Sequence, residues 1–204
     1  MSLVLYHASP SRSAGTRALL AELGAEYELK VLNLKEREEY KPEYLAINPM
    51  GKVPTIVHNG AVITEQVAIY TYLADAFPQA KMAPPIGDPQ RGPYLRWMAF
   101  YGSCFEPAII DLALKREAPP YSMCPYGNVD TVMSALWKHI ETAQPWFLGE
   151  QFTALDVLWG SALTWMAKFE LVQLTKPAEE YLIRVNARPA IQRAAVEESK
   201  LAGY

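Results

Sequence analysis

The sequence has few of the residues that build metal centres and disulfide frameworks. Its 204 residues include two cysteines, Cys104 and Cys124, and three histidines, His7, His58 and His139. Two cysteines cannot form a disulfide framework or a cysteine-rich zinc site, and the histidines show no metal-ligand spacing. We therefore expect no metal. A thiol–disulfide reductase is also disfavoured, because it needs a cysteine near the first strand and both cysteines lie beyond residue 100.

A surplus of basic charge and a long apolar run are missing too. Nineteen Lys and Arg against 22 Asp and Glu give a net charge of −3, which disfavours a nucleic-acid partner. The longest mostly apolar run, 157–167, is far shorter than the roughly 20 residues of a membrane span. The first residues show no secretory signal pattern. Because apolar residues make up 50% of the chain, global disorder is excluded, and we expect a cytoplasmic globular protein without a membrane partner.

Proline and glycine concentrate in one stretch and divide the chain there. Both disfavour regular structure, so the stretch predicts a linker over 79–90 between a domain at 1–78 and a domain at 91–204. The first domain is predicted to be α/β with the order β-α-β-α-β-β-α, and its Asn59-Gly60 pair is typical of a hairpin. The second is predicted to be all-helical, and Thr153 to Asp156 matches a helix capping box.

A serine-rich turn, 9–16, follows the first predicted strand and leads into a helix. A helix N-terminus offers free N–H groups and a positive dipole end, so it favours an anion and helps a nearby thiol to lose its proton. Ser11 and Ser13 are candidates to assist such a thiolate. The alternative is that the serines are ordinary caps and turn formers.

Two further segments are candidates for ligand binding. Val53-Pro54 opens a strand, and if its peptide bond is cis, the Val53 backbone can pair with an extended ligand; the alternative is a trans proline at a strand edge. Glu65 and Gln66 open a helix, where N–H groups suit a carboxylate and Glu65 suits an ammonium. The alternative is that Glu65 only complements the helix dipole.

The order of these segments resembles the glutathione S-transferase superfamily along the whole chain. The likeness is most specific in YLAINPMGKVPTIVHNGAVITEQVAIYTYLAD, 44–75, which is similar to bacterial beta-class members. It implies a thioredoxin-like N-terminal domain, an all-α C-terminal domain and a glutathione site between them. In the beta class a catalytic Cys lies five residues after the first-strand tyrosine; here that position, counted from Tyr6, is Ser11, and a count from the end of the first helix points nearer to Ser13.

The resemblance also implies the remaining site residues. It assigns Val53, before a cis Pro54, to the cysteinyl part of glutathione, and Glu65 and Gln66 to the γ-glutamyl end; serine is frequent in the family at the position of Gln66. Lys35 and Lys52 match positions that meet the glycine carboxylate.

The leading functional hypothesis is a glutathione transferase, with glutathione as co-substrate and a small electrophile as its partner. The resemblance further implies a homodimer and a role in detoxification. The alternative is a non-catalytic module of the same architecture that serves in protein interaction or regulation. The combination of Glu65, Gln66, Lys52 and Val53-Pro54 disfavours that alternative, because a scaffold does not need these residues.

Overall fold

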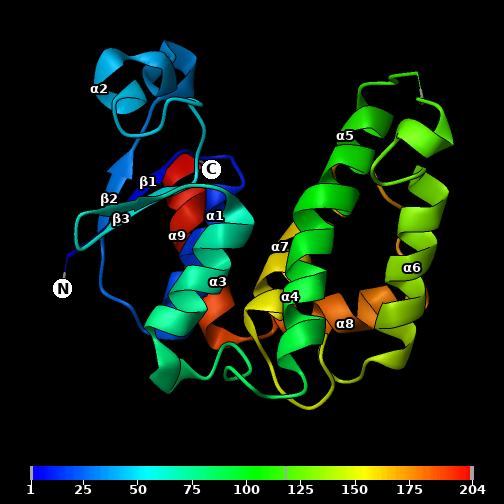
Figure 1. Cartoon of the computed structure of the whole chain (residues 1–204). Coiled ribbons are helices and arrows are strands. Elements are labelled where there is room, and N and C mark those ends of the chain that lie inside the picture. Colours follow the sequence, from blue (N-terminus) through cyan, green and yellow to red (C-terminus); the bar gives the residue numbers. More distant parts are fainter. Residues whose placement is uncertain (1, 118, 203–204) are drawn as a thin grey trace. The chain divides into compact units, whose positions relative to one another are not determined.

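A four-stranded mixed sheet forms the centre of the first structural unit. The computed structural model of the chain describes residues 2–117 and 119–202. The strands are β1 (Leu3–His7), β2 (Glu28–Val31), β3 (Thr55–His58) and β4 (Ala61–Ile63), in the spatial order β2-β1-β3-β4. β1 runs parallel to β2 and antiparallel to β3, and β4 is antiparallel to β3 (Figure 1). Leu3, Leu5 and His7 of β1 are buried on one face, as the period of two in a strand requires.

The helices of this unit follow the predicted order. They are α1 (Ser13–Leu23), α2 (Pro42–Leu45) and α3 (Gln66–Ala76), with the 3-10 turns η1 (Leu34–Glu36), η2 (Glu38–Tyr40) and η3 (Pro78–Ala80). Gly24 ends α1 in the left-handed conformation, at φ 62°. Asn59 and Gly60 both have positive φ and form the predicted hairpin turn between β3 and β4. The thioredoxin-like α/β prediction is therefore confirmed.

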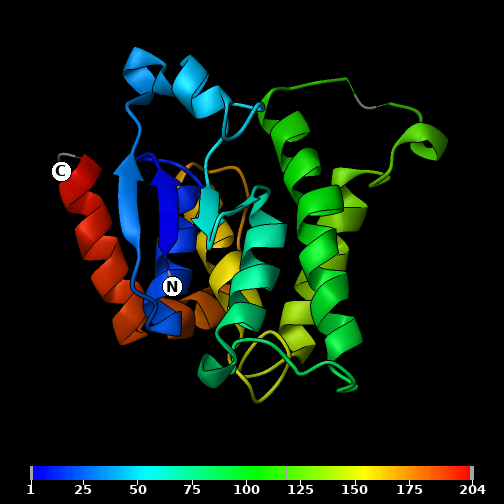
Figure 2. The same ribbon diagram turned by 60° about the vertical axis from the view of Figure 1, so that its left-hand side comes forward.

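The last helix, α9 (Pro189–Ala202), belongs to this first unit. The chain divides into one unit that runs to Ala80 and resumes at Arg188, and a second unit, Lys81–Ala187. Figures 1 and 2 show α9, in red, beside the blue α1. Buried alanines on α9, Ala190 and Ala194, allow close packing, and Arg188 binds Glu22 of α1 through two hydrogen bonds of 2.7 and 2.6 Å.

The predicted all-α region at 91–204 is helical, and its last helix, α9, groups with the first unit. An amphipathic pattern shows that a helix buries one face, but it does not show which surface covers that face. Residues of the linker predicted over 79–90 contact the second unit. Met82 is buried, its carbonyl accepts the N–H of Ala154 at 2.8 Å, and the carbonyl of Pro84 accepts a hydrogen bond from Arg91 at 3.0 Å, all within the second unit.

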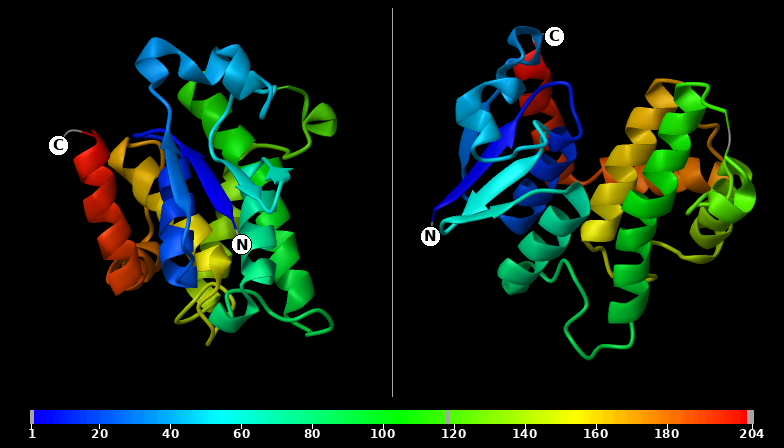
Figure 3. Two further views of the ribbon diagram at one scale, coloured as in Figure 1. Left: turned by 90° about the vertical axis from the view of Figure 1, so that its left-hand side faces the viewer. Right: turned by 45° about the horizontal axis from the view of Figure 1, so that its top comes forward.

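The second unit is all-helical, as predicted. Its elements are α4 (Arg91–Phe100), the π-helical turn η4 (Tyr101–Phe105), α5 (Glu106–Ala113), the 3-10 turn η5 (Tyr121–Met123), α6 (Val129–Thr142), α7 (Ala154–Lys168) and α8 (Lys176–Asn186). α4 continues through η4 into α5, and the yellow α7 lies beside this green helix (Figure 3). Trp159 of α7 is fully buried among aromatic rings that include Trp97 and Phe147.

The predicted capping box at the start of α7 is confirmed. Thr153 Oγ1 accepts the N–H of Leu155, and the Asp156 carboxylate accepts the N–H of Thr153 at 2.8 Å. Within the described ranges 2–117 and 119–202, no helix is long and apolar enough to cross a membrane.

Candidate functional site

A small pocket in the first unit brings together residues from three separate segments. Its volume is about 180 Å³, and it is lined by Ser11, Arg12, Leu34, Glu39, Tyr40, Gly51, Lys52 and Val53. Three predicted site residues, Ser11, Lys52 and Val53, thus share one cavity. Because pockets for drug-sized ligands are typically about 300–1,000 Å³, this cavity suits one part of an extended molecule.

A buried polar cluster fixes the loop that presents Lys52 and Val53. The Lys52 carbonyl accepts hydrogen bonds from Asn48 Nδ2 at 2.9 Å and from Thr55 Oγ1 at 3.2 Å, and also from the Tyr44 hydroxyl. Burial raises the pKa of Tyr44, so its hydroxyl stays protonated as a donor. The Lys52 and Val53 backbone is therefore held in place before any ligand arrives.

Gly51 lets this loop approach the turn around Glu39 closely. Its φ is 58°, and a Cβ added there would lie 2.9 Å from the Glu39 carbonyl oxygen. Both the conformation and the space require glycine. The bond between Val53 and Pro54 is cis, as the family resemblance implies, and Pro54 itself is buried.

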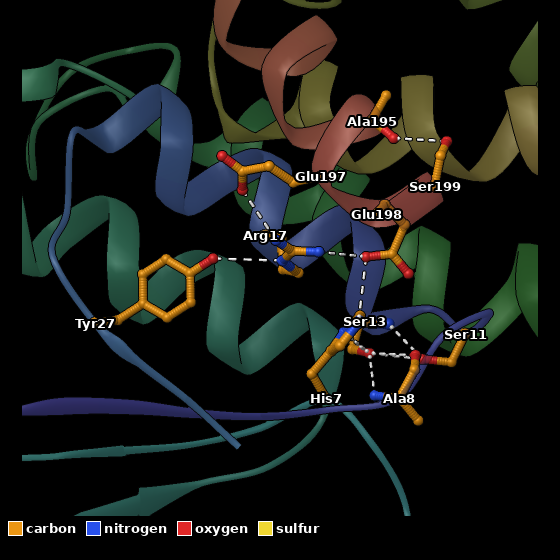
Figure 4. Close-up of polar contacts among 10 residues, drawn as sticks. All are labelled: His7, Ala8, Ser11, Ser13, Arg17, Tyr27, Ala195, Glu197, Glu198 and Ser199. Carbon is orange, nitrogen blue, oxygen red and sulfur yellow. Dashed lines mark hydrogen bonds and ion pairs between the residues drawn. The ribbon is translucent and has the colours of Figure 1, made fainter. Parts of the chain in front are cut away.

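The serine turn forms a chain of short hydrogen bonds behind the pocket (Figure 4). Ser11 Oγ lies 2.6 Å from Ser13 Oγ, and Ser13 Oγ lies 2.7 Å from His7 Nδ1. Ser11 Oγ also accepts the N–H of Ser13 at 3.1 Å. Ser11 is half-buried and lines the pocket, whereas Ser13 is fully buried beneath it, so Ser11 is the hydroxyl that a ligand can reach.

Charged side chains from α1 and α9 lie beside His7, at the end of the hydrogen-bond network farthest from Ser11. His7 Nε2 lies 3.2 Å from Glu198 Oε2, which is an ion-pair distance when His7 is protonated, but the geometry does not meet the criteria for a hydrogen bond. The same carboxylate accepts a 2.7 Å hydrogen bond from Arg17, which also bonds Glu197 at 3.0 Å. Burial opposes ionisation of Glu198, but the contacts with His7, Ser9 and Arg17 outweigh it and lower its pKa to about 2. Glu198 is therefore a carboxylate at neutral pH.

The other predicted site residues lie outside the pocket lining. Glu65 is the exposed residue before α3, where it adopts φ 62° and its side chain does not cap the helix. Gln66 is the half-buried first residue of α3. Lys35 is exposed on η1, next to Leu34 of the pocket wall. Tyr6, on β1, packs its ring against Tyr44 at 5.4 Å between centroids.

Several residues of the site carry no signal that we recognised in the sequence. The pocket wall from Leu34 to Tyr40 reads there as an irregular crossover. His7 follows the four apolar strand residues 3–6 and resembles a strand end in the sequence. Glu198 lies on a helix that returns from the far end of the chain. Within residues 2–117 and 119–202, no group of three or more His, Cys, Asp or Glu side chains could hold a metal ion.

Comparison with known families places this architecture. Residues 1–75 match the family "Glutathione S-transferase, N-terminal domain". A similar protein along nearly the whole chain is glutathione S-transferase GstA of Escherichia coli O157:H7, 26% identical over 95% of this chain and 98% of its own length. The N-terminal part of the chain belongs to the glutathione S-transferase family, and the chain is similar to superfamily members along nearly its whole length.

Solved structures of the superfamily share the fold of this chain. A glutathione transferase from Methylococcus capsulatus has a TM-score of 0.80 at 27% identity, covering 97% of this chain and 99% of its own. A sphingomonad glutathione S-transferase complexed with glutathione has a TM-score of 0.79 at 28% identity, covering 96% and 98%. The superfamily fold therefore extends over both units of the chain.

Proposed function

We propose that this protein binds glutathione at the Ser11 pocket and transfers its thiolate to a small electrophile. The observation that carries the proposal is that Ser11, Lys52 and Val53 line one cavity. The coarser activity, glutathione transfer, is supported by full-length relatives named as glutathione transferases, one of them solved with glutathione.

The loop at Val53 suits the peptide backbone of glutathione. Its conformation is fixed by Asn48, Thr55 and Tyr44, so an extended ligand can pair with Val53 at little cost in ordering the loop. Lys52 lines the same cavity and offers a cation to the glycine carboxylate, with Lys35 as the second candidate on the neighbouring turn.

The γ-glutamyl end is assigned to Glu65 and Gln66. A non-glycine residue at φ 62° is uncommon, and such conformations cluster at ligand-binding sites. Because the Glu65 carboxylate does not cap α3, its position is not explained by helix capping. It suits the ammonium of the ligand, while the Gln66 amide and the first N–H groups of α3 suit the carboxylate.

The chemistry proposed for Ser11 is stabilisation of the thiolate. A free thiol with a pKa of about 8.5 is only a few per cent ionised at neutral pH. A hydroxyl donor beside the sulfur, close to the N-terminus of α1, favours the ionised form. The thiolate then attacks the electrophilic carbon of the second substrate.

Calorimetry and turnover together test this function. We expect the protein to bind glutathione and to consume it with at least one member of a panel of aryl halides, epoxides, organic peroxides and unsaturated carbonyl compounds. Binding without turnover on the whole panel would instead favour the non-catalytic module. Absence of glutathione binding would contradict the proposal.

We also propose that the protein is a cytoplasmic homodimer that acts in detoxification. The support for the dimer is similarity to the superfamily. Light scattering at micromolar concentration should give twice the chain mass of 22.9 kDa, and a mass equal to one chain would overturn the proposed dimer.

A further inference from the structure

His7 and Glu198 are charged or ionisable groups behind the pocket that the proposed function does not use. His7 is fully buried at the end of β1, and Glu198 comes from α9, about 190 residues later in the sequence (Figure 4). Burying an imidazole beside a carboxylate is costly unless both are partnered. The two serine hydroxyls connect this pair directly to the pocket, with no step longer than 3.2 Å from Ser11 to Glu198.

We propose that Ser11, Ser13 and His7 form a proton relay that takes the proton of the bound glutathione thiol. In this relay Glu198 contacts His7 Nε2 and stabilises the positive charge that forms on the imidazole. This inference rests on the proposed function. The S–H bond of the thiol breaks as its proton passes to Ser11 Oγ. The Ser11 proton passes to Ser13 Oγ, and the Ser13 proton passes to His7 Nδ1, so that the products are a thiolate and an imidazolium.

The hydrogen bonds around Ser13 fit the arrangement before the transfer. Ser13 Oγ lies 3.2 Å from the backbone nitrogen of Ala8, 3.2 Å from the Ala8 carbonyl oxygen, 2.6 Å from Ser11 Oγ and 2.7 Å from His7 Nδ1. His7 Nδ1 is nearer than the Ala8 carbonyl and is therefore the preferred acceptor of the Ser13 proton. A serine hydroxyl donates once and accepts twice. With neutral His7, Ser13 accepts from Ala8 and Ser11 and donates to His7 Nδ1, and the remaining imidazole proton lies on Nε2, facing Glu198.

The same contacts fit the arrangement after the transfer without any movement of heavy atoms. Ser13 then accepts from Ala8 and from His7 Nδ1 and donates to Ser11. Ser11 Oγ accepts from Ser13 twice, through the Ser13 N–H at 3.1 Å and the Ser13 hydroxyl at 2.6 Å. Its own proton is therefore free to point into the pocket, where it stabilises the new thiolate. One network thus serves both to remove the proton and to bind the product anion.

The charged groups near His7 come from α1 and α9. Glu198 of α9 contacts both His7 and Arg17 of α1, whereas the more exposed Glu197 contacts only Arg17 of the two, so the carboxylate nearest to a proton on His7 is that of Glu198. From the other neighbouring elements, β2 places uncharged Val31 beside His7, and β3 places uncharged Thr55 beside the preceding residue. Glu198 is the carboxylate in contact with His7, and its side chain is only 17% exposed, so solvent screens this contact weakly.

Glu197 provides a matched control for Glu198. Both carboxylates bind Arg17, but the His7 contact is made by Glu198, and the Glu197 side chain is 61% exposed. We expect Glu198→Gln to raise the pKa of the bound thiol by about one unit, so that the ionised fraction at pH values well below that pKa falls about tenfold. The acid limb of the kcat–pH profile should move by the same amount. Glu197→Gln should change the thiol pKa and the position of the acid limb by no more than a few tenths of a pH unit.

Proton counting distinguishes the relay from simple thiolate stabilisation. Glutathione binding is measured near pH 7 by calorimetry in buffers of different ionisation enthalpy, alongside the ultraviolet absorbance of the thiolate. The relay predicts that thiolate forms while almost no proton reaches the buffer. Release of about one proton per thiolate formed would overturn it, as would equal thiol titrations in the Glu198→Gln and Glu197→Gln variants.

A second variant covers the case in which Glu198→Gln disturbs the packing of α9. His7→Gln keeps an amide of similar size but cannot take up a proton, so it should also raise the pKa of the bound thiol while glutathione affinity changes less than threefold. An unchanged thiol pKa in folded His7→Gln would contradict the relay. Failure of the wild-type protein to bind glutathione would contradict the proposed function itself, so the two failures are distinguishable.

Discussion

The structure distinguishes the roles of two serines in the first unit, Ser11 and Ser13. Ser11 and Ser13 are both reasonable helix caps in the sequence. In the structure Arg12 occupies the N-cap position without a side-chain cap, and Ser11 Oγ accepts the N–H of Ser13, the first residue of α1. Ser13 is buried against His7, and Ser11 faces the pocket. The two serines therefore have different surroundings, and substitution of each should give a different result.

Glu65 gives the most direct residue-scale prediction for binding. Glu65→Ala should weaken glutathione binding several-fold or more, because the ligand ammonium loses its anionic partner. Glu43→Ala provides the control, since Glu43 is an exposed acid on α2 of the same unit and lies outside the pocket lining. Calorimetry on both variants measures the effect, and equal affinities in the two would remove Glu65 from the site.

The sequence predicts individual site residues best where a local motif carries them. Pro54 and Gly51 stand in a distinctive segment, and the structure gives them the cis bond and positive φ that the motif requires. His7 and Glu198 are different, because their contact joins the two ends of the chain and exists only after α9 has packed on α1. A contact between residues so far apart in the sequence is not marked by any local sequence motif.

At the scale of elements, the cap of α7 has a measurable pH dependence. Burial raises the pKa of Asp156 to about 6 from an ordinary 3.8, although the N–H groups of Phe147 and Thr153 and the Tyr181 hydroxyl oppose the rise. Between about pH 4 and pH 6 the folded protein therefore holds a proton that the unfolded chain has lost. The contribution of Asp156 to the free energy of unfolding therefore falls by about 3 kcal/mol as pH rises through that window.

Asp156→Asn should remove this dependence. Denaturant unfolding at several pH values should show that the wild-type free energy of unfolding declines relative to the variant between pH 4 and pH 6. Asp130→Asn serves as the control, because Asp130 lies in the first turn of α6 and is exposed. Parallel pH profiles for wild type and Asp156→Asn would show that the buried carboxyl titrates near its ordinary pKa.

Close packing of α7 on α8 gives a second prediction at this scale. A Cβ added at Gly160 would lie 2.5 Å from Val185 Cγ1, so Gly160→Ala should cost about 1–3 kcal/mol despite the better helix propensity of alanine. Val185→Ala in the same chain should recover part of the loss. Gly92→Ala on α4, where the added Cβ meets nothing within 4 Å, should be neutral or stabilising. Thermal unfolding of the four proteins checks this, and a stable Gly160→Ala variant would contradict it.

Elements are predictable from the sequence when a stop signal or cap marks them. The Asn59-Gly60 turn and the Thr153–Asp156 box each mark an end that the structure confirms. Between α4 and α5 the helix passes through the π-helical turn Tyr101–Phe105, in which Tyr101 and Phe105 are buried. Side-chain periodicity alone does not distinguish α from π geometry over so few residues.

At the scale of the whole molecule, chain order and structural unit do not coincide. The first unit breaks off at Ala80, beside the proline-rich stretch, and resumes at Arg188, a return that no local pattern in the sequence marks. This return has a functional consequence, because it brings Glu198 to His7 behind the pocket. The ends of the chain are thus joined at the proposed thiol site.

The central claim is that the Ser11 pocket binds glutathione and ionises its thiol. The most direct measurement is the ultraviolet absorbance of the bound thiolate against pH, in wild type and in Ser11→Ala, with affinity and turnover measured on the same samples. We predict that the bound thiol of wild type titrates well below the free value of about 8.5, and that Ser11→Ala raises this pKa. Turnover in the variant should fall about 10- to 1000-fold with little loss of affinity. Identical titrations in the two proteins would contradict the claim.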